Sequence, residues 1–74
     1  MRKYYVIYII TDEGEDGYFS RISDNTIYIR SLDQAWSTYS HEVANVKADY
    51  LCRIANWIHT ARVEKTDPWE QGRW

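Results

Sequence analysis

The sequence contains few of the residues that usually indicate an activity. It has one cysteine and two histidines among 74 residues, and its formal net charge at pH 7 is only −2. A single cysteine excludes an internal disulfide framework and fits a reducing compartment. A nearly balanced charge is not typical of a protein that holds nucleic acid mainly through its phosphates, so direct nucleic-acid binding is not the expected function.

Long apolar runs are also missing. The clearest apolar run, residues 4–10, is too short to span a membrane, and acidic residues follow it directly, unlike a signal peptide. We therefore expect a cytoplasmic protein with no membrane contact. A chain of this length can form one core, with little room for an enclosed pocket of about 300 Å³ or more.

Catalytic groups are scarce. Neither His41 nor His59 has a cysteine, serine or carboxylate at a spacing typical of a triad or a metal site. Cys52 lies in an apolar helical stretch, which suggests a small buried side chain. Gly14 and Gly17 lie among acids that would repel a phosphate group. We expect no enzyme activity, no cofactor and no metal.

Alternation of side chains predicts several strands. Residues 4–10 are almost entirely β-branched or aromatic and are apolar on both faces, which is typical of a central strand. Residues 18–22 should return as a hairpin, and residues 27–29 can supply a third short strand. Residues 60–65 alternate small or apolar with charged side chains, as a last strand with one exposed face would.

Two helical segments are predicted between these strands. Ser31 and Gln34 have the spacing of a capping box, which should open a short helix. Ser40 can cap a main helix over about residues 41–57. The apolar residues expected along one stripe of that region are Val43, Ala44, Leu51, Ile54, Ala55 and Ile58.

The expected fold class is therefore α+β. The order β-β-(β)-α-α-β predicts a small antiparallel sheet of three to four strands with helix packed on one face. Residues 1–67 should form a single domain, followed by a short aromatic C-terminal tail over residues 68–74.

The first hairpin carries four acids in five positions, which are Asp12, Glu13, Glu15 and Asp16. Calcium binding is disfavoured because Gly14 occupies a ligand position of the EF-hand pattern and no glutamate closes a twelve-residue loop. Two interpretations remain. The acids form a solvated turn that keeps the hairpin soluble, or they contact a groove lined by arginine and lysine that normally holds nucleic acid.

The high aromatic content is the second unusual feature of the sequence. Four Trp, seven Tyr and one Phe exceed what a small core buries, and the surplus either covers that core or anchors an interface. The best candidates for exposure are Tyr18, Tyr28, Tyr39, Trp69 and Trp74. The predicted partner-binding residues are therefore Asp12, Glu13, Glu15, Asp16, Tyr18, Tyr28, Trp69 and Trp74.

Two alternatives use the aromatic residues differently. One is a small regulator that stacks single-stranded bases on a sheet face formed by Tyr18, Phe19, Arg21, Tyr28 and Arg30. The other is a self-assembling structural protein in which exposed Trp and Tyr side chains form a homodimer.

Several segments together resemble short phage and prophage proteins. They are Tyr4-Tyr5-Val6, Gly17-Tyr18-Phe19-Ser20-Arg21-Ile22, Ser31-Leu32-Asp33-Gln34-Ala35-Trp36 and Ala61-Arg62-Val63-Glu64-Lys65. Several known members of that class, including anti-CRISPR proteins, block host machinery by stoichiometric binding. The resemblance implies a protein-binding inhibitor in the cytoplasm of a bacterial host, with a nuclease or CRISPR effector as its partner. It carries over no functional residue, and the tail after Pro68 departs from the pattern.

Overall fold

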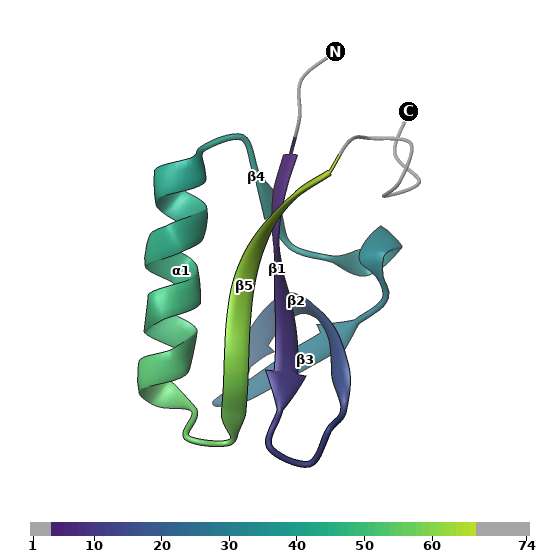
Figure 1. The fold of residues 1–74 in the computed structure, drawn as a ribbon, viewed down its shortest axis with the longest axis vertical. Helices are drawn as coiled ribbons and strands as arrows, with labels where there is room; N and C mark the ends of the chain where they lie inside the picture. Colours follow the sequence, from purple (N-terminus) through teal and green to yellow (C-terminus); the bar gives the residue numbers. More distant parts are fainter. Residues whose placement is uncertain (1–3, 67–74) are drawn as a thin grey trace.

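The computed structural model describes residues 4–66 as a five-stranded antiparallel sheet with one α-helix against it (Figure 1). The α+β class is confirmed. In chain order the elements are β1 (Tyr4–Thr11), β2 (Asp16–Ser23), β3 (Thr26–Arg30), the 3-10 turn η1 (Leu32–Gln34), β4 (Ser37–Thr38), α1 (His41–Ile54) and β5 (Ile58–Thr66). The sheet has one strand more than the upper prediction, and only one of the two predicted helices forms. The predicted tail and the domain boundary at residue 67 lie outside the described residues.

β1 is the central strand, as its two apolar faces predicted. One edge pairs along its length with β5, whereas the other is shared by two strands. β2 pairs with Tyr8–Ile10, and the two-residue strand β4 pairs with Tyr5 and Val6. β2 then continues beyond β1 with β3 as its partner. The β2–β3 hairpin therefore extends past the rest of the sheet.

The turn of that hairpin follows from its two residues. Asp24 and Asn25 have φ angles of 51° and 62°. A tight hairpin turn of this kind needs positive φ at both central positions, and Asp and Asn tolerate this conformation better than most residues. The third strand, which the sequence left open, therefore forms with a well-matched turn.

The predicted helix at Ser31 is wrong. The Ser31 hydroxyl donates to the carboxylate of Asp33 and caps no backbone amide, so only the three residues of η1 turn. The chain is extended again at Ala35, whose side chain is buried. The Trp36 amide then donates to the Phe19 carbonyl at 2.8 Å. Because Trp36 bonds to β2 and the following strand β4 pairs with β1, the helical turn does not continue beyond Gln34.

The main helix begins where predicted but is shorter. The Ser40 hydroxyl accepts from the Val43 amide at 3.2 Å, which confirms the N-cap. The helix ends at Ile54, because Ala55 is extended and leads through a turn into β5. Cys52 is exposed, so the prediction of a buried cysteine is wrong. It lies on a flank of the helix, four positions after the buried Ala48.

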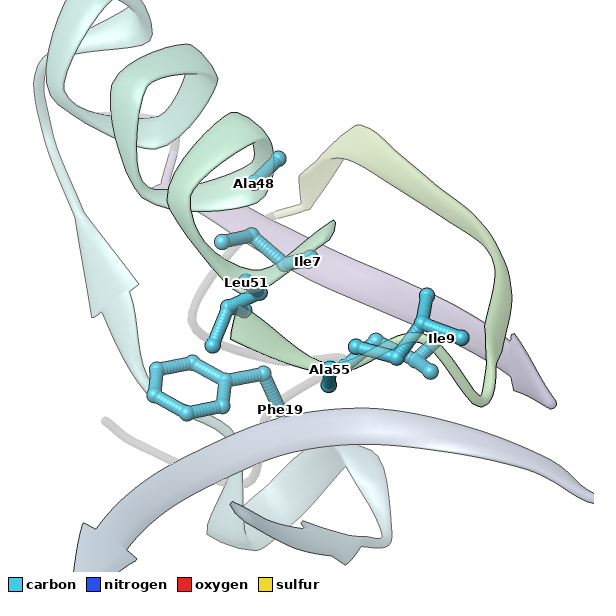
Figure 2. Close-up of a cluster of buried hydrophobic side chains, with 7 residues drawn as sticks. Ile7, Ile9, Phe19, Ala48, Leu51 and Ala55 are labelled. Atoms are coloured by element: carbon cyan, nitrogen blue, oxygen red, sulfur yellow. The ribbon is translucent and has the colours of Figure 1, made fainter. Parts of the chain in front are cut away.

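The core lies between α1 and the sheet. Ile7 and Ile9 from β1, Phe19 from β2 and Leu51 from α1 form its centre (Figure 2). The helix presents the small side chains of Ala44 and Ala48 on its buried side, which lets it approach the strands closely. Ala44, Ala48 and Leu51 recur at helical spacing and define the buried side of α1, and Ala55, directly after the helix, is buried with them. Val43 and Ile54, both predicted to be buried, are 48% and 49% exposed.

Candidate functional site

The acidic loop, residues 12–15 between β1 and β2, is held by backbone hydrogen bonds. The Thr11 amide donates to the Glu15 carbonyl at 2.8 Å, and the Gly14 amide donates to the Thr11 carbonyl at 3.0 Å. Gly14 has φ +87°, a left-handed conformation that suits glycine. With the backbone closed in this way, the side chains of Asp12 and Glu13 and that of Glu15 face solvent.

This loop is fastened to the turn that follows α1. The Asp12 amide donates to the Trp57 carbonyl at 2.9 Å, and a carboxylate oxygen of Asp12 lies 3.7 Å from Nδ1 of His59. Trp57 is 39% exposed and lines the same hollow as the loop. The structure therefore places an exposed indole beside the predicted carboxylates. The sequence alone gives no signal for Trp57 at this site, because its position depends on the contact between two distant turns.

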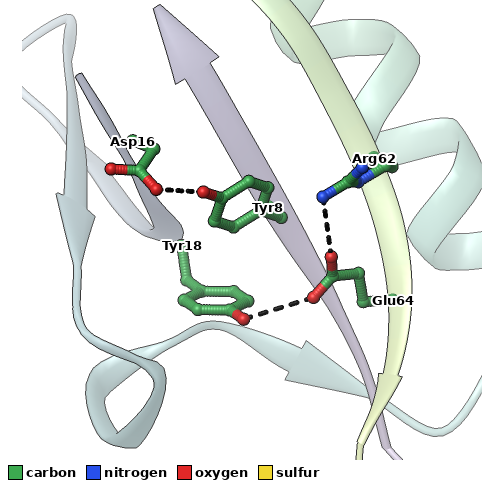
Figure 3. A network of polar contacts seen from close by, with 5 residues as sticks. All are labelled: Tyr8, Asp16, Tyr18, Arg62 and Glu64. Carbon is green, nitrogen blue, oxygen red and sulfur yellow. Dashed lines mark hydrogen bonds and ion pairs between the residues drawn. The ribbon is translucent and has the colours of Figure 1, made fainter. Parts of the chain in front are cut away.

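Asp16 does not belong to the acidic loop, although it was predicted with it. It is the first residue of β2, and its carboxylate accepts a hydrogen bond from the Tyr8 hydroxyl (Figure 3). That hydrogen bond is the main reason that the pKa of Tyr8 lies above 10.0, its ordinary value. All four carboxylates are exposed, but those of Asp12, Glu13 and Glu15 lie on the loop, whereas that of Asp16 lies on β2 and accepts from Tyr8.

Tyr18 also takes part in a sheet network. Its hydroxyl donates to Oε1 of Glu64 at 3.2 Å, and the other oxygen of Glu64 pairs with Arg62 at the same distance (Figure 3). The Tyr18 ring meets the Tyr8 ring edge to face, with 5.2 Å between the ring centres. Tyr18 is half-buried, so the structure gives it a role in joining three strands.

Tyr28 lies on the same sheet face, the one opposite α1. Its side chain is half-buried. Two guanidinium groups lie over its ring, with their central carbons 4.7 Å (Arg21) and 5.0 Å (Arg30) from the ring centre. Arg62 covers the Tyr8 ring in the same manner, at 5.1 Å. This face, the tyrosine–arginine face, is defined by Tyr8, Tyr18, Tyr28, Arg21, Arg30 and Arg62. Phe19, predicted to join it, faces the core instead because it alternates with Tyr18.

Of the remaining predicted aromatic residues, Tyr39 is 53% exposed, as expected. Its ring packs against that of Tyr4, with 4.9 Å between the ring centres. Trp69 and Trp74, both predicted to bind a partner, lie outside the described residues. Tyr18 and Tyr28 are less exposed than predicted, because the sheet networks above hold them.

A further surface, which the sequence did not predict, lies on α1. Six large apolar side chains that are at least a third exposed gather between α1 and the β2–β3 hairpin. This apolar groove is formed by Ile22, Val43, Val46, Tyr50, Ile54 and Trp57. Its hollow continues into that of the acidic loop, since Ile27 and Trp57 line both. Contiguous exposed apolar surface of this kind marks interaction sites.

Among residues 4–66, no three His, Cys, Asp or Glu side chains gather closely enough to hold a metal ion. No helix in this part of the chain is long and apolar enough to cross a membrane. Comparison of the chain with protein-family models, with curated proteins and with solved structures found no match.

Proposed function

We propose that this protein is a non-enzymatic inhibitor that docks its acidic loop onto the nucleic-acid-binding surface of another protein. The observation that carries the proposal is a loop with three exposed carboxylates, those of Asp12, Glu13 and Glu15, beside the exposed Trp57. The partner's chemistry follows from this surface. It is a protein with an arginine- and lysine-lined groove.

The geometry of the loop supports this function. Carboxylates accept charge-assisted hydrogen bonds from arginine and lysine as phosphate groups do. The backbone bonds around Thr11 hold the loop closed before any partner arrives, so less conformational freedom is lost on binding. Within the described chain no cation forms an ion pair with Glu13 or Glu15. Their charges therefore remain available to a partner.

The resemblance to phage and prophage proteins extends the proposal. On that basis the partner is a bacterial nuclease or a CRISPR effector, and inhibition is stoichiometric in the bacterial cytoplasm. A bound inhibitor of this kind excludes DNA or RNA by covering the same basic residues. Competition with nucleic acid therefore distinguishes this function from binding to some other surface of the partner.

The test neutralises the three loop carboxylates without changing their shape, as Asp12→Asn, Glu13→Gln and Glu15→Gln. The immobilised protein is incubated with a nuclease-treated bacterial lysate, and captured proteins are identified by mass spectrometry. We expect the wild-type protein to retain a nucleic-acid-binding protein that added duplex DNA releases. The triple variant should bind that protein at least about tenfold more weakly, as is usual when several interfacial charges are lost.

A matched control removes three charges elsewhere, as Asp24→Asn, Asp33→Asn and Asp49→Asn. These carboxylates are exposed and lie on the hairpin turn, on η1 and on the polar side of α1. This control should bind like the wild type. Equal weakening by both variants, or capture that DNA does not reverse, would refute docking through the loop.

The tyrosine–arginine face favours a second candidate function, binding of single-stranded nucleic acid. Aromatic rings flanked by guanidinium groups stack on bases and attract phosphates. Asp16 and Glu64 on the same face oppose it, because they contribute negative charge. Binding to an oligo-dT probe would be followed by fluorescence anisotropy in about 50 mM salt, where phosphate contacts are strongest. This candidate predicts binding that the pair Arg21→Ala and Arg30→Ala abolishes, and the absence of any signal would eliminate it.

A further inference from the structure

The apolar groove exists because α1 is apolar on two adjoining sides. The buried side is defined by Ala44, Ala48 and Leu51, and the neighbouring side carries Val43, Val46, Tyr50 and Ile54. This second side does not pack into the core. It forms one wall of the groove, and Ile22 with Ile27 from the β2–β3 hairpin forms the other.

The dimensions of the groove suit a helix. Val43 and Ile54 are eleven positions apart in the sequence, so this side of α1 is about 16 Å long, or three helical turns. Val46, at 70% exposure, and Tyr50, at 48%, stand in its middle. Anchors repeated every three or four residues along a helix match the side chains that a second, parallel or antiparallel helix presents.

Charge distinguishes the two ends of the groove from its floor. Glu42 lines one end, and the acidic loop lies at the other, beyond Trp57. In the floor, the Lys47 ammonium is already placed near two rings, 5.7 Å from the centre of Trp36 and 5.8 Å from that of Tyr50. Among the described residues Glu42 forms no ion pair. Both ends therefore carry a surplus of carboxylates, with Glu42 at one and Asp12, Glu13 and Glu15 beside a single cation, Arg30, at the other, and Lys47 is the one charged side chain that lines the groove between them.

We infer that the apolar groove binds a basic amphipathic helix of the partner protein. The apolar side of that helix covers Val46, Tyr50 and Ile54, and its lysine and arginine residues meet the carboxylates at the two ends. This inference rests on the proposed function, since it supplies the element by which the same partner is held. A second copy of this chain fits less well, because its net charge of −2 offers no surplus of cations. An anionic lipid surface would be repelled by the same carboxylates.

The test uses three synthetic probe peptides of about 18 residues, or five helical turns. One places leucine at helical spacing and lysine elsewhere, the second replaces every lysine by glutamate, and the third scrambles the leucine–lysine sequence. Backbone resonances of the isotope-labelled protein report where each binds. We expect the leucine–lysine helix to shift signals of α1 from Val43 to Ile54, of Trp57 and of the acidic loop. The other two peptides should bind at least about tenfold more weakly.

Variants on α1 separate the groove from the rest of the surface. The pair Val46→Gln and Ile54→Gln changes exposed side chains only, and should weaken the leucine–lysine peptide at least about tenfold while leaving the fold intact. The matched control, Asn45→Gln with Cys52→Ser, lies on the opposite, polar side of α1 and should bind like the wild type.

Three outcomes overturn the inference. They are equal binding of the lysine and glutamate peptides, equal binding by the groove and control variants, and signals that shift only on the tyrosine–arginine face. Self-association without peptide that the groove variant removes assigns the groove to a second copy instead. The proposed function is judged separately, by DNA competition with the loop variant. If the groove variant binds the peptide as the wild type does, the inference about the groove fails, but the result of the DNA competition still stands.

Discussion

Replacing Leu51 by alanine should lower the free energy of unfolding by about 3 kcal/mol, a typical cost for a fully buried leucine. The Leu51 side chain has no exposed surface and packs between α1 and the strands, against Ile7 and Phe19 (Figure 2). The alanine variant leaves a cavity that backbone elements on both sides keep from collapsing. Urea unfolding followed by far-UV circular dichroism measures the loss.

The matched control for this substitution is Ile54→Ala, three positions further along α1. Ile54 is 49% exposed and lines the apolar groove. Its loss should cost less than about 1 kcal/mol, since little apolar area is uncovered and alanine favours the helix. If Leu51→Ala and Ile54→Ala destabilised the protein equally, Ile54 would also be buried. The helix would then be rotated from its place in the structure, and the apolar groove would not exist.

The second large effect is expected at Phe19, whose replacement by alanine should cost about 4 kcal/mol. Phe19 is 3% exposed and joins β2 to the core, and its ring also packs against Trp36 with 5.9 Å between the ring centres. Because β2 pairs with β1 over only a short stretch, this side chain holds the β2–β3 hairpin close to α1. Its loss should therefore loosen one wall of the groove.

Two measurements check the Phe19 prediction. Urea unfolding gives the loss of stability, and hydrogen exchange should become faster for the amides of β2 and β3 than for those of β5. Ile22→Ala is the control on the same strand. Ile22 is 38% exposed, so its loss should cost less than about 1 kcal/mol. Uniform exchange across the sheet would contradict a separate role for the hairpin.

What the sequence predicts well depends on local signals. The strand over residues 4–10 is confirmed because both of its faces are apolar, and the N-cap at Ser40 because one hydroxyl contacts an amide three residues away. The helix at Ser31 failed because a pairing partner distant in the chain, Phe19, holds Trp36 extended. A strand of two residues such as β4 leaves no periodic signal at all.

The same contrast between local and long-range signals applies to the candidate site. The three loop acids are exposed as their sequence pattern suggested, whereas Asp16 is drawn to Tyr8 by the pleat of the sheet. The side of α1 that faces the core could not be chosen from its pattern, because apolar residues cover more than half of its circumference. Which part is buried is decided by the strands that α1 meets. The groove is the part left over, so only the tertiary structure could reveal it.

The pairing of Tyr4 with Thr66 has a practical consequence for handling the molecule. Both ends of the described chain leave the sheet at one pole, whereas the acidic loop begins after Thr11, about seven strand residues or 23 Å away (Figure 1). A tether attached at Tyr4 or at Thr66 would therefore leave the acidic loop at the opposite pole. A larger carrier placed at these two residues should leave the loop carboxylates uncovered.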